Sequence, residues 1–174
     1  MTSGALFLFA LTLVQGSAPP PAAPSLVLSC GEQSSEVTLT IRNADQTDTA
    51  VLIGMALANG RWYQPRELVM ELRRNGSPDV EELLYNGATN IAGRIDHWVV
   101  ALPAGATYAL TLRAAEFAST SATRAGTPPE ELRVRLTGRP ITSDLNVDMT
   151  GMKAWRLWTG SVSSNALRFS DCAN

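Results

Sequence analysis

The chain of 174 residues carries 16 acidic and 14 basic side chains, a formal net charge of −2, and 45% of its residues are hydrophobic. This composition is typical of one folded domain of ordinary size and excludes an intrinsically disordered chain. The nearly balanced charge also excludes a general electrostatic attraction to nucleic acid or to anionic lipid. Thirteen of the fourteen basic residues are arginine, and with the many alanines this usage favours a GC-rich bacterial source.

The first residues have the pattern of an export signal. Ala5 to Val14 is an apolar run of ten residues, the length of a signal-peptide core and too short to cross a bilayer. Small residues follow at Gly16 and Ala18, so we predict a signal peptide over residues 1–18, with cleavage after Gly16 as an alternative. No Lys or Arg precedes the run, and a buried N-terminal strand or helix is the second interpretation. The exported chain would be periplasmic or secreted, without stable membrane insertion after processing.

A proline-rich spacer follows, over residues 19–25. Its composition favours an extended polyproline segment. Val27-Leu28-Ser29-Cys30 has the letters of a lipoprotein acylation site, but such a site directly follows the apolar run, and here the spacer intervenes. Acylation of Cys30 therefore stays the alternative, and we place the folded domain at 26–174.

Cys30 and Cys172 are the only cysteines and bracket nearly the whole predicted domain. An even count in an exported chain favours a disulfide. Closing a loop of this length would restrict the unfolded chain by about 5 kcal/mol in the chain-entropy model. The bridge would tie the first strand to the last. Two separate buried thiols are the alternative.

From residue 26 onward, apolar side chains alternate with polar ones, which predicts strands and not helices. The almost continuous apolar run 51–57 predicts a central strand covered on both faces. Three Asn-Gly pairs, at 59–60, 75–76 and 86–87, tolerate the positive φ of tight hairpin turns. Many short strands with regular turns predict an all-β, immunoglobulin-like β-sandwich of about eight strands. We expect a long loop at 114–129, with a helical turn at its start. The alternating segments are 26–30, 37–42, 68–73, 98–102, 108–112, 132–136 and 162–169.

The segment Leu102-Pro103-Ala104-Gly105-Ala106-Thr107-Tyr108-Ala109-Leu110 resembles the corner before a late strand in fibronectin type III and related immunoglobulin-like domains. The resemblance covers nine residues. It implies that Tyr108 fills the core while its hydroxyl bonds back to the backbone of the corner. Leu110 stands where antibody domains have a cysteine two residues after this tyrosine. A Cys30–Cys172 bridge would therefore differ from the inter-sheet disulfide of antibodies.

Residues for catalysis or metal binding are scarce. His97 is the only histidine, and its neighbour Asp96 would point to the opposite face of a strand. One histidine and two bridged cysteines leave too few ligands for zinc. The stretch Asp144–Asp148 opens like a calcium loop, but Met149 stands where the sharp turn needs glycine. We therefore predict no enzyme activity, no metal site and no cofactor.

Two aromatic clusters are the best candidates for binding. Trp62 follows the first Asn-Gly pair, and Trp155-Arg156-Leu157-Trp158 lies near the C-terminus. Exposed Trp and Arg are frequent at the centre of protein interfaces, and Trp rings also stack on sugars. The alternative is that these rings pack in the core. We expect a non-enzymatic binding or structural domain with a protein partner, or else a carbohydrate-binding module that uses Trp62, Trp155 or Trp158 on a glycan.

Overall fold

The computed structural model describes residues 20–33, 35–57, 62–87, 93, 95–119, 129–141 and 156–172. In these ranges the regular structure consists of β-strands and two short 3-10 helices, which confirms the all-β prediction. The helices are η1 (Ala114–Glu116) and η2 (Phe169–Cys172). The strands are β1 (Ser25–Cys30), β2 (Glu36–Arg42), β3 (Thr49–Leu57), β4 (Tyr63–Gln64), β5 (Leu68–Arg74), β6 (Val80–Tyr85), β7 (Ile95–Leu102), β8 (Thr107–Arg113), β9 (Phe117–Ser119), β10 (Pro129–Gly138), β11 (Arg156–Leu157), β12 (Gly160–Ser163) and β13 (Leu167–Arg168).

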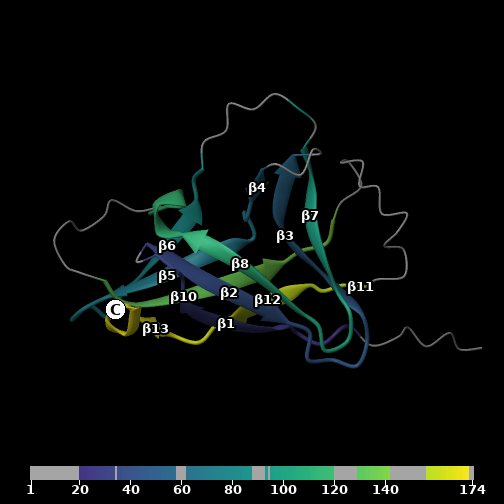
Figure 1. Ribbon diagram of the computed structural model, residues 1–174, viewed down its shortest axis with the longest axis horizontal. Helices are drawn as coiled ribbons and strands as arrows, with labels where there is room; N and C mark the ends of the chain where they lie inside the picture. The colour runs from purple at the N-terminus through teal and green to yellow at the C-terminus, as the bar shows by residue number, and fades with distance from the viewer. Residues whose placement is uncertain are drawn as a thin grey trace, which may run out of the picture.

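The strands form three sheets. The first has the order β1-β2-β8, and the second has the order β12-β10-β5-β6-β9, with β13 also on β10. In the third, β11 and β4 lie along β3, which also pairs with β7. Figure 1 shows β1, β2 and β8 running across β5 and β10. Side chains from both of these sheets share one apolar core, so the fold is a β-sandwich with a smaller third sheet.

Period-two alternation explains which side chains enter the core. In β2, Leu39 and Ile41 are fully buried, while the two threonines that alternate with them are only partly covered. The register places Leu39 opposite Leu28 of β1 and opposite Leu110 of β8. Each fully buried Leu or Ile contributes about 1.5–3 kcal/mol relative to an exposed one. The buried members of the core are Leu26, Leu28, Val37, Leu39, Ile41, Val51, Ile53, Leu68, Met70, Leu72, Val100, Leu102, Leu112, Phe117, Leu132, Val134, Leu136 and Trp158.

Strand β3 is covered on both faces along its first six residues, as its apolar run predicts. A bulge lies opposite β7 between Leu52 and Gly54. At Gly54 the backbone of the segment around β4 approaches so closely that a Cβ atom would lie 1.9 Å from the carbonyl oxygen of Gln64. Glycine is therefore required here for packing, and not for a turn.

The two Asn-Gly pairs that the structure describes have different structural roles, although hairpin turns were predicted at both. Asn75-Gly76 turns the β5–β6 hairpin: Ser77 N–H donates to the Arg74 carbonyl (3.1 Å), and Gly76 has φ +71°. Asn86-Gly87 is not a hairpin turn. Asn86 N–H donates to the carbonyl of Glu116 (2.8 Å) and so continues the pairing of β6 with β9. The pair 59–60 lies outside the described residues.

The predicted loop at 114–129 is partly wrong. It begins with the expected helical turn, η1, but Phe117–Ser119 is strand β9, which pairs with β6. The physical reason is an apolar anchor in this otherwise small-residue segment. Phe117 is buried, and its ring meets Tyr85 edge to face at 5.6 Å between centroids. Residues 120–128 lie outside the described ranges, and β10 begins at Pro129.

Candidate functional site

The predicted disulfide is confirmed. Cys30 at the end of β1 is bonded to Cys172 at the end of η2, with the two Cα atoms 5.3 Å apart and a sequence separation of 142. A structural disulfide is typical of an oxidising, extracellular compartment. Among the described residues no helix is long and apolar enough to cross a membrane.

The corner before β8 has the predicted turn but a different anchor. Ala106 N–H donates to the Pro103 carbonyl (2.9 Å), and Gly105 has φ +73°. The turn is fastened by Asn43, whose N–H donates to the Ala106 carbonyl and whose side-chain amide donates to the Leu102 carbonyl, both at 2.9 Å. Asn43 is 1% exposed. In the sequence, Asn43 stands two residues after Ile41, so strand alternation places its side chain inward. A polar group that is buried in this way needs hydrogen-bond partners.

Tyr108 packs against the core, as the resemblance implies. Its hydroxyl accepts a hydrogen bond from the indole of Trp98 on β7. Burial raises the pKa of this hydroxyl, with a smaller contribution from Tyr63. The pair Tyr108–Trp98 thus joins two strands that belong to different sheets.

The residues predicted to bind a ligand differ in exposure where the structure describes them. Trp158 is 3% exposed, which corrects the expectation of an exposed ring: its indole packs against Gly138 and Gly160, where a Cβ atom would lie 2.6 Å and 3.2 Å from the ring. Trp62 is half-buried, Arg156 is exposed in β11, and Trp155 lies outside the described residues.

One further aromatic pair reaches the surface. Tyr63 is 46% exposed and its ring lies 4.8 Å from that of Trp98. The two ring planes are inclined at 50°. They therefore do not form the coplanar platform on which a sugar ring would stack.

His97 occupies a half-buried position on β7. Its Nε2 atom is covered and has no hydrogen-bond partner within the described ranges. Those ranges contain no group of three or more His, Cys, Asp or Glu side chains placed to hold a metal ion.

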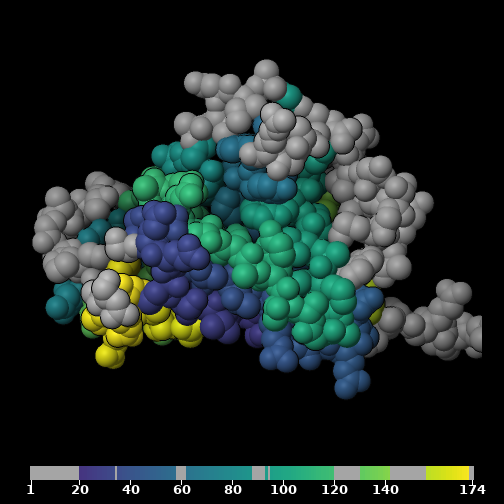
Figure 2. Space-filling model, in the orientation of Figure 1, coloured from purple at the N-terminus to yellow at the C-terminus, as the bar shows by residue number. Residues whose placement is uncertain are grey.

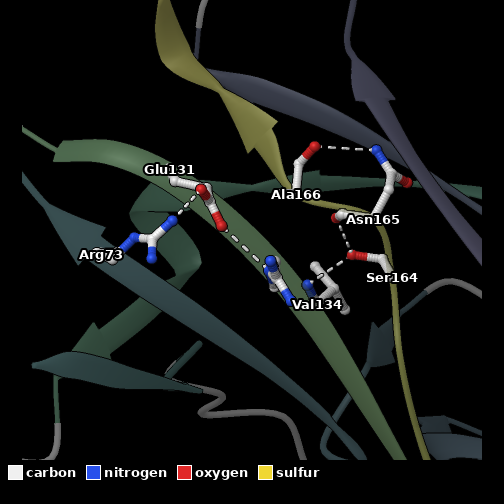
Figure 3. Close-up of polar contacts among 7 residues, drawn as sticks. Arg73, Glu131, Val134, Ser164, Asn165 and Ala166 are labelled. Atoms are coloured by element: carbon white, nitrogen blue, oxygen red, sulfur yellow. Dashed lines mark hydrogen bonds and ion pairs between the residues drawn. The ribbon is translucent and has the colours of Figure 1, made fainter. Parts of the chain in front are cut away.

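The outer face of β6, β5 and β10 carries interlocked ion pairs, and we call it the ion-pair face. Arg135 donates to Glu71 at 2.6 Å and also contacts Glu82, so one guanidinium joins all three strands. Glu131 binds Arg73 across the β5–β10 ladder and Arg133 along its own strand, where the distance is 3.1 Å; Figure 3 shows the Arg73–Glu131 contact. The members of this face are Glu71, Arg73, Glu82, Glu131, Arg133 and Arg135.

A shallow hollow of about 220 Å³ lies on the ion-pair face. It is lined by Glu71, Arg73, Val80, Glu131 and Arg133. Four of these five residues already pair with one another or with Arg135. A ligand would have to compete with these pairs, so the hollow is a weak candidate for a binding site.

Lowering the pH should weaken the ion-pair face through Glu131. Burial acts to raise the pKa of this carboxyl, but the hydrogen bonds from Arg73 and Arg133 outweigh it and hold the pKa below its usual 4.5. A carboxyl whose pKa is lower when folded stabilises the fold above its unfolded pKa, and the contribution is lost as the pH falls through the folded pKa. We expect the free energy of unfolding of Glu131→Gln to fall less than that of the wild type between pH 7 and pH values below 4.5.

Urea denaturation at a series of pH values measures this difference. The control is Asp79→Asn, at an exposed position of the β5–β6 turn. It measures the effect of removing one negative charge that is not a member of the ion-pair face. Equal pH dependence in Glu131→Gln and the wild type would contradict the prediction.

The outer face of β1, β2 and β8 has a different character, and we call it the hydroxyl face. Its cross-strand rows include Val27–Thr40–Ala109 and Ser29–Thr38–Thr111. Val27 is 52% exposed. Charged side chains stand only at its two ends, with Arg42 at one and the Arg113–Glu36 pair (3.0 Å) at the other. Its uncharged members are Ser25, Val27, Ser29, Thr38, Thr40, Thr107, Ala109 and Thr111.

Sequence reasoning missed the hydroxyl face. Its signal is the set of outward positions in three alternating segments, which apart from Arg42 at one end are occupied by small or β-branched uncharged residues. Figure 2 shows β2 and β8 at the surface on this side of the molecule. Comparison of the chain with protein-family models, with curated proteins and with solved structures gives no match.

Proposed function

We propose that this chain is an exported, non-enzymatic domain of the immunoglobulin-like kind that binds a protein partner through the hydroxyl face. Export is supported by the apolar run at residues 5–14 and by the Cys30–Cys172 disulfide. The immunoglobulin-like assignment is supported by the two facing sheets and by the Leu102–Leu110 corner.

The observation that carries the proposal is the contrast between the two outer faces. Removing a charged group from water is costly, and the buried centres of protein interfaces are depleted in charged residues. Covering the ion-pair face would desolvate six charged side chains. A partner that covers the hydroxyl face between Arg42 and Arg113 would desolvate no charged side chain among the members of this face. A partner can therefore cover the hydroxyl face at a lower cost.

A lysine placed in the centre of the hydroxyl face tests the proposal. Ala109 is exposed on β8, opposite Thr40. We expect Ala109→Lys to weaken partner binding at least tenfold, about 1.4 kcal/mol or more, because the new charge would be buried without a partner. The matched control is Val80→Lys, which adds the same charge at a 56% exposed position on the other sheet.

Binding is measured by cross-linking the folded protein in the exported protein fraction of the producing organism. The expected result is a set of cross-linked proteins that is lost with Ala109→Lys and kept with Val80→Lys. Capture that is equal in all three proteins contradicts the use of this face. Binding to a glycan array that depends on Trp62 would instead support the carbohydrate-binding alternative.

A further inference from the structure

Strand β1 has the composition of an edge that pairs readily with other strands. It stands at one end of its sheet, and its sequence Ser-Leu-Val-Leu-Ser-Cys contains no charged residue and no proline. Exposed edges of this kind are templates for pairing with another chain, and proteins block them with charge, proline, bulges or a covering segment. In β1 the first two of these devices are missing.

A side chain occupies the outer edge of β1. Leu28 N–H donates to Oδ1 of Asn165 (2.7 Å), and Nδ2 of Asn165 donates to the Leu28 carbonyl (3.0 Å). Both backbone groups of Leu28 therefore point away from β2, and in an antiparallel ladder Leu26 and Cys30 direct theirs to the same side. The Asn165 amide thus takes the place that a peptide group of a neighbouring strand would take.

The segment that carries Asn165 is held firmly on the opposite sheet. Ser164 is 6% exposed and pairs with Val134 of β10 twice: its N–H donates to the Val134 carbonyl (2.9 Å), and its Oγ accepts from Val134 N–H (3.0 Å). The hydroxyl of Ser164 also donates to the Asn165 carbonyl (2.7 Å), as Figure 3 shows. We call residues Ser164–Ala166 the edge plug.

The Cys30–Cys172 disulfide lies at the end of β1, two residues after Leu28. Cys30 is the next residue of β1 whose backbone faces the same side as that of Leu28. Its bond to Cys172 holds the C-terminal segment against the end of the strand. The edge plug is thus fixed to β10 by Ser164, to β1 by Asn165, and to the end of β1 through the disulfide.

We propose that the edge plug keeps β1 from pairing with β1 of a second copy of this chain. A second copy is the partner that fits, because β1 has no charge with which to repel itself. Antiparallel pairing across a two-fold axis would place Leu26 and Leu28 beside the same residues of the partner strand. Asn165 is then a positioning residue that blocks self-association, because its amide occupies the backbone N–H and carbonyl of Leu28.

Two substitutions at Asn165 separate edge protection from simple stability. Asn165→Ala removes both bonds to Leu28 and leaves the backbone N–H and carbonyl of Leu28 unpaired at an uncharged edge. Asn165→Asp also loses the bond to the Leu28 carbonyl, but it places a negative charge at the edge. Analytical ultracentrifugation of the oxidised protein is expected to show a doubled mass for Asn165→Ala, and the wild-type mass for Asn165→Asp.

A second change identifies the surface. Val27→Lys in the Asn165→Ala background places a charge on β1, and we expect it to restore the wild-type mass. Folded Asn165→Ala with the wild-type mass, or a doubled mass that Val27→Lys leaves in place, overturns the proposal. If Asn165→Ala does not fold, Asn165→Ser takes its place, because its shorter side chain also withdraws both hydrogen bonds from Leu28. The same doubling is expected, and its absence in the folded variant overturns the proposal equally.

Discussion

Removal of the Cys30–Cys172 disulfide is expected to lower the free energy of unfolding by about 5 kcal/mol in the chain-entropy model. The bond joins residues separated by 142 positions, and a loop of this length removes many conformations from the unfolded chain. It also holds η2 and the edge plug against β1. Urea denaturation of the wild type and of the double variant Cys30→Ala, Cys172→Ala measures the difference.

The control for this prediction is the oxidised wild type, in which thiol titration under denaturing conditions without reductant should find no free thiol. Two free thiols would show that the bond is absent from the protein as it is produced. A double variant whose stability lies within about 1 kcal/mol of the wild type contradicts the expected magnitude.

Trp158→Ala is expected to destabilise the fold by about 3–5 kcal/mol, as large-to-small changes of buried aromatic residues do. The indole is 3% exposed and lies between two glycines whose missing side chains leave room for it. Its backbone N–H also donates to the Ala50 carbonyl of β3 (2.8 Å) and aligns the segment before β12. Alanine would leave a cavity beside Gly138 and Gly160, which have no side chains to fill it.

Trp62→Ala is the matched control, because Trp62 is only half-buried and its removal should cost less. Both variants are compared by urea denaturation and by binding to a glycan array. The prediction is contradicted if Trp158→Ala keeps its stability and loses binding to a glycan. That result would make Trp158 a ligand-binding residue and not a core residue.

The strands could be predicted well because alternation is a local property. The outward positions of β2 and β10 are polar and the inward positions apolar, so burial of one face follows from the order of residues alone. Local signals were less reliable where a residue has several uses. Asn75-Gly76 turns a hairpin and Asn86-Gly87 extends a pairing, although the two dipeptides are identical. Their neighbours in space, and not their own preferences, decide the difference.

The candidate site could not be predicted from the aromatic residues. Trp and Arg are common both in interfaces and in cores or ion pairs, so composition does not distinguish the two for Trp158. The hydroxyl face depends on β8 lying beside β2, two strands that are far apart along the chain. The role of Asn165 depends on a contact with Leu28, 137 residues away.

The sequence by itself determined the all-β class, the inward and outward sides of most strands, and the pairing of the two cysteines. These features follow from period-two burial and from having a single pair of thiols. Only the tertiary structure decided that Trp158 is buried, that the centre of one outer face carries no charge, and that Asn165 covers the edge of β1. Each of these depends on which distant segments become neighbours, and that is set by packing of the whole core.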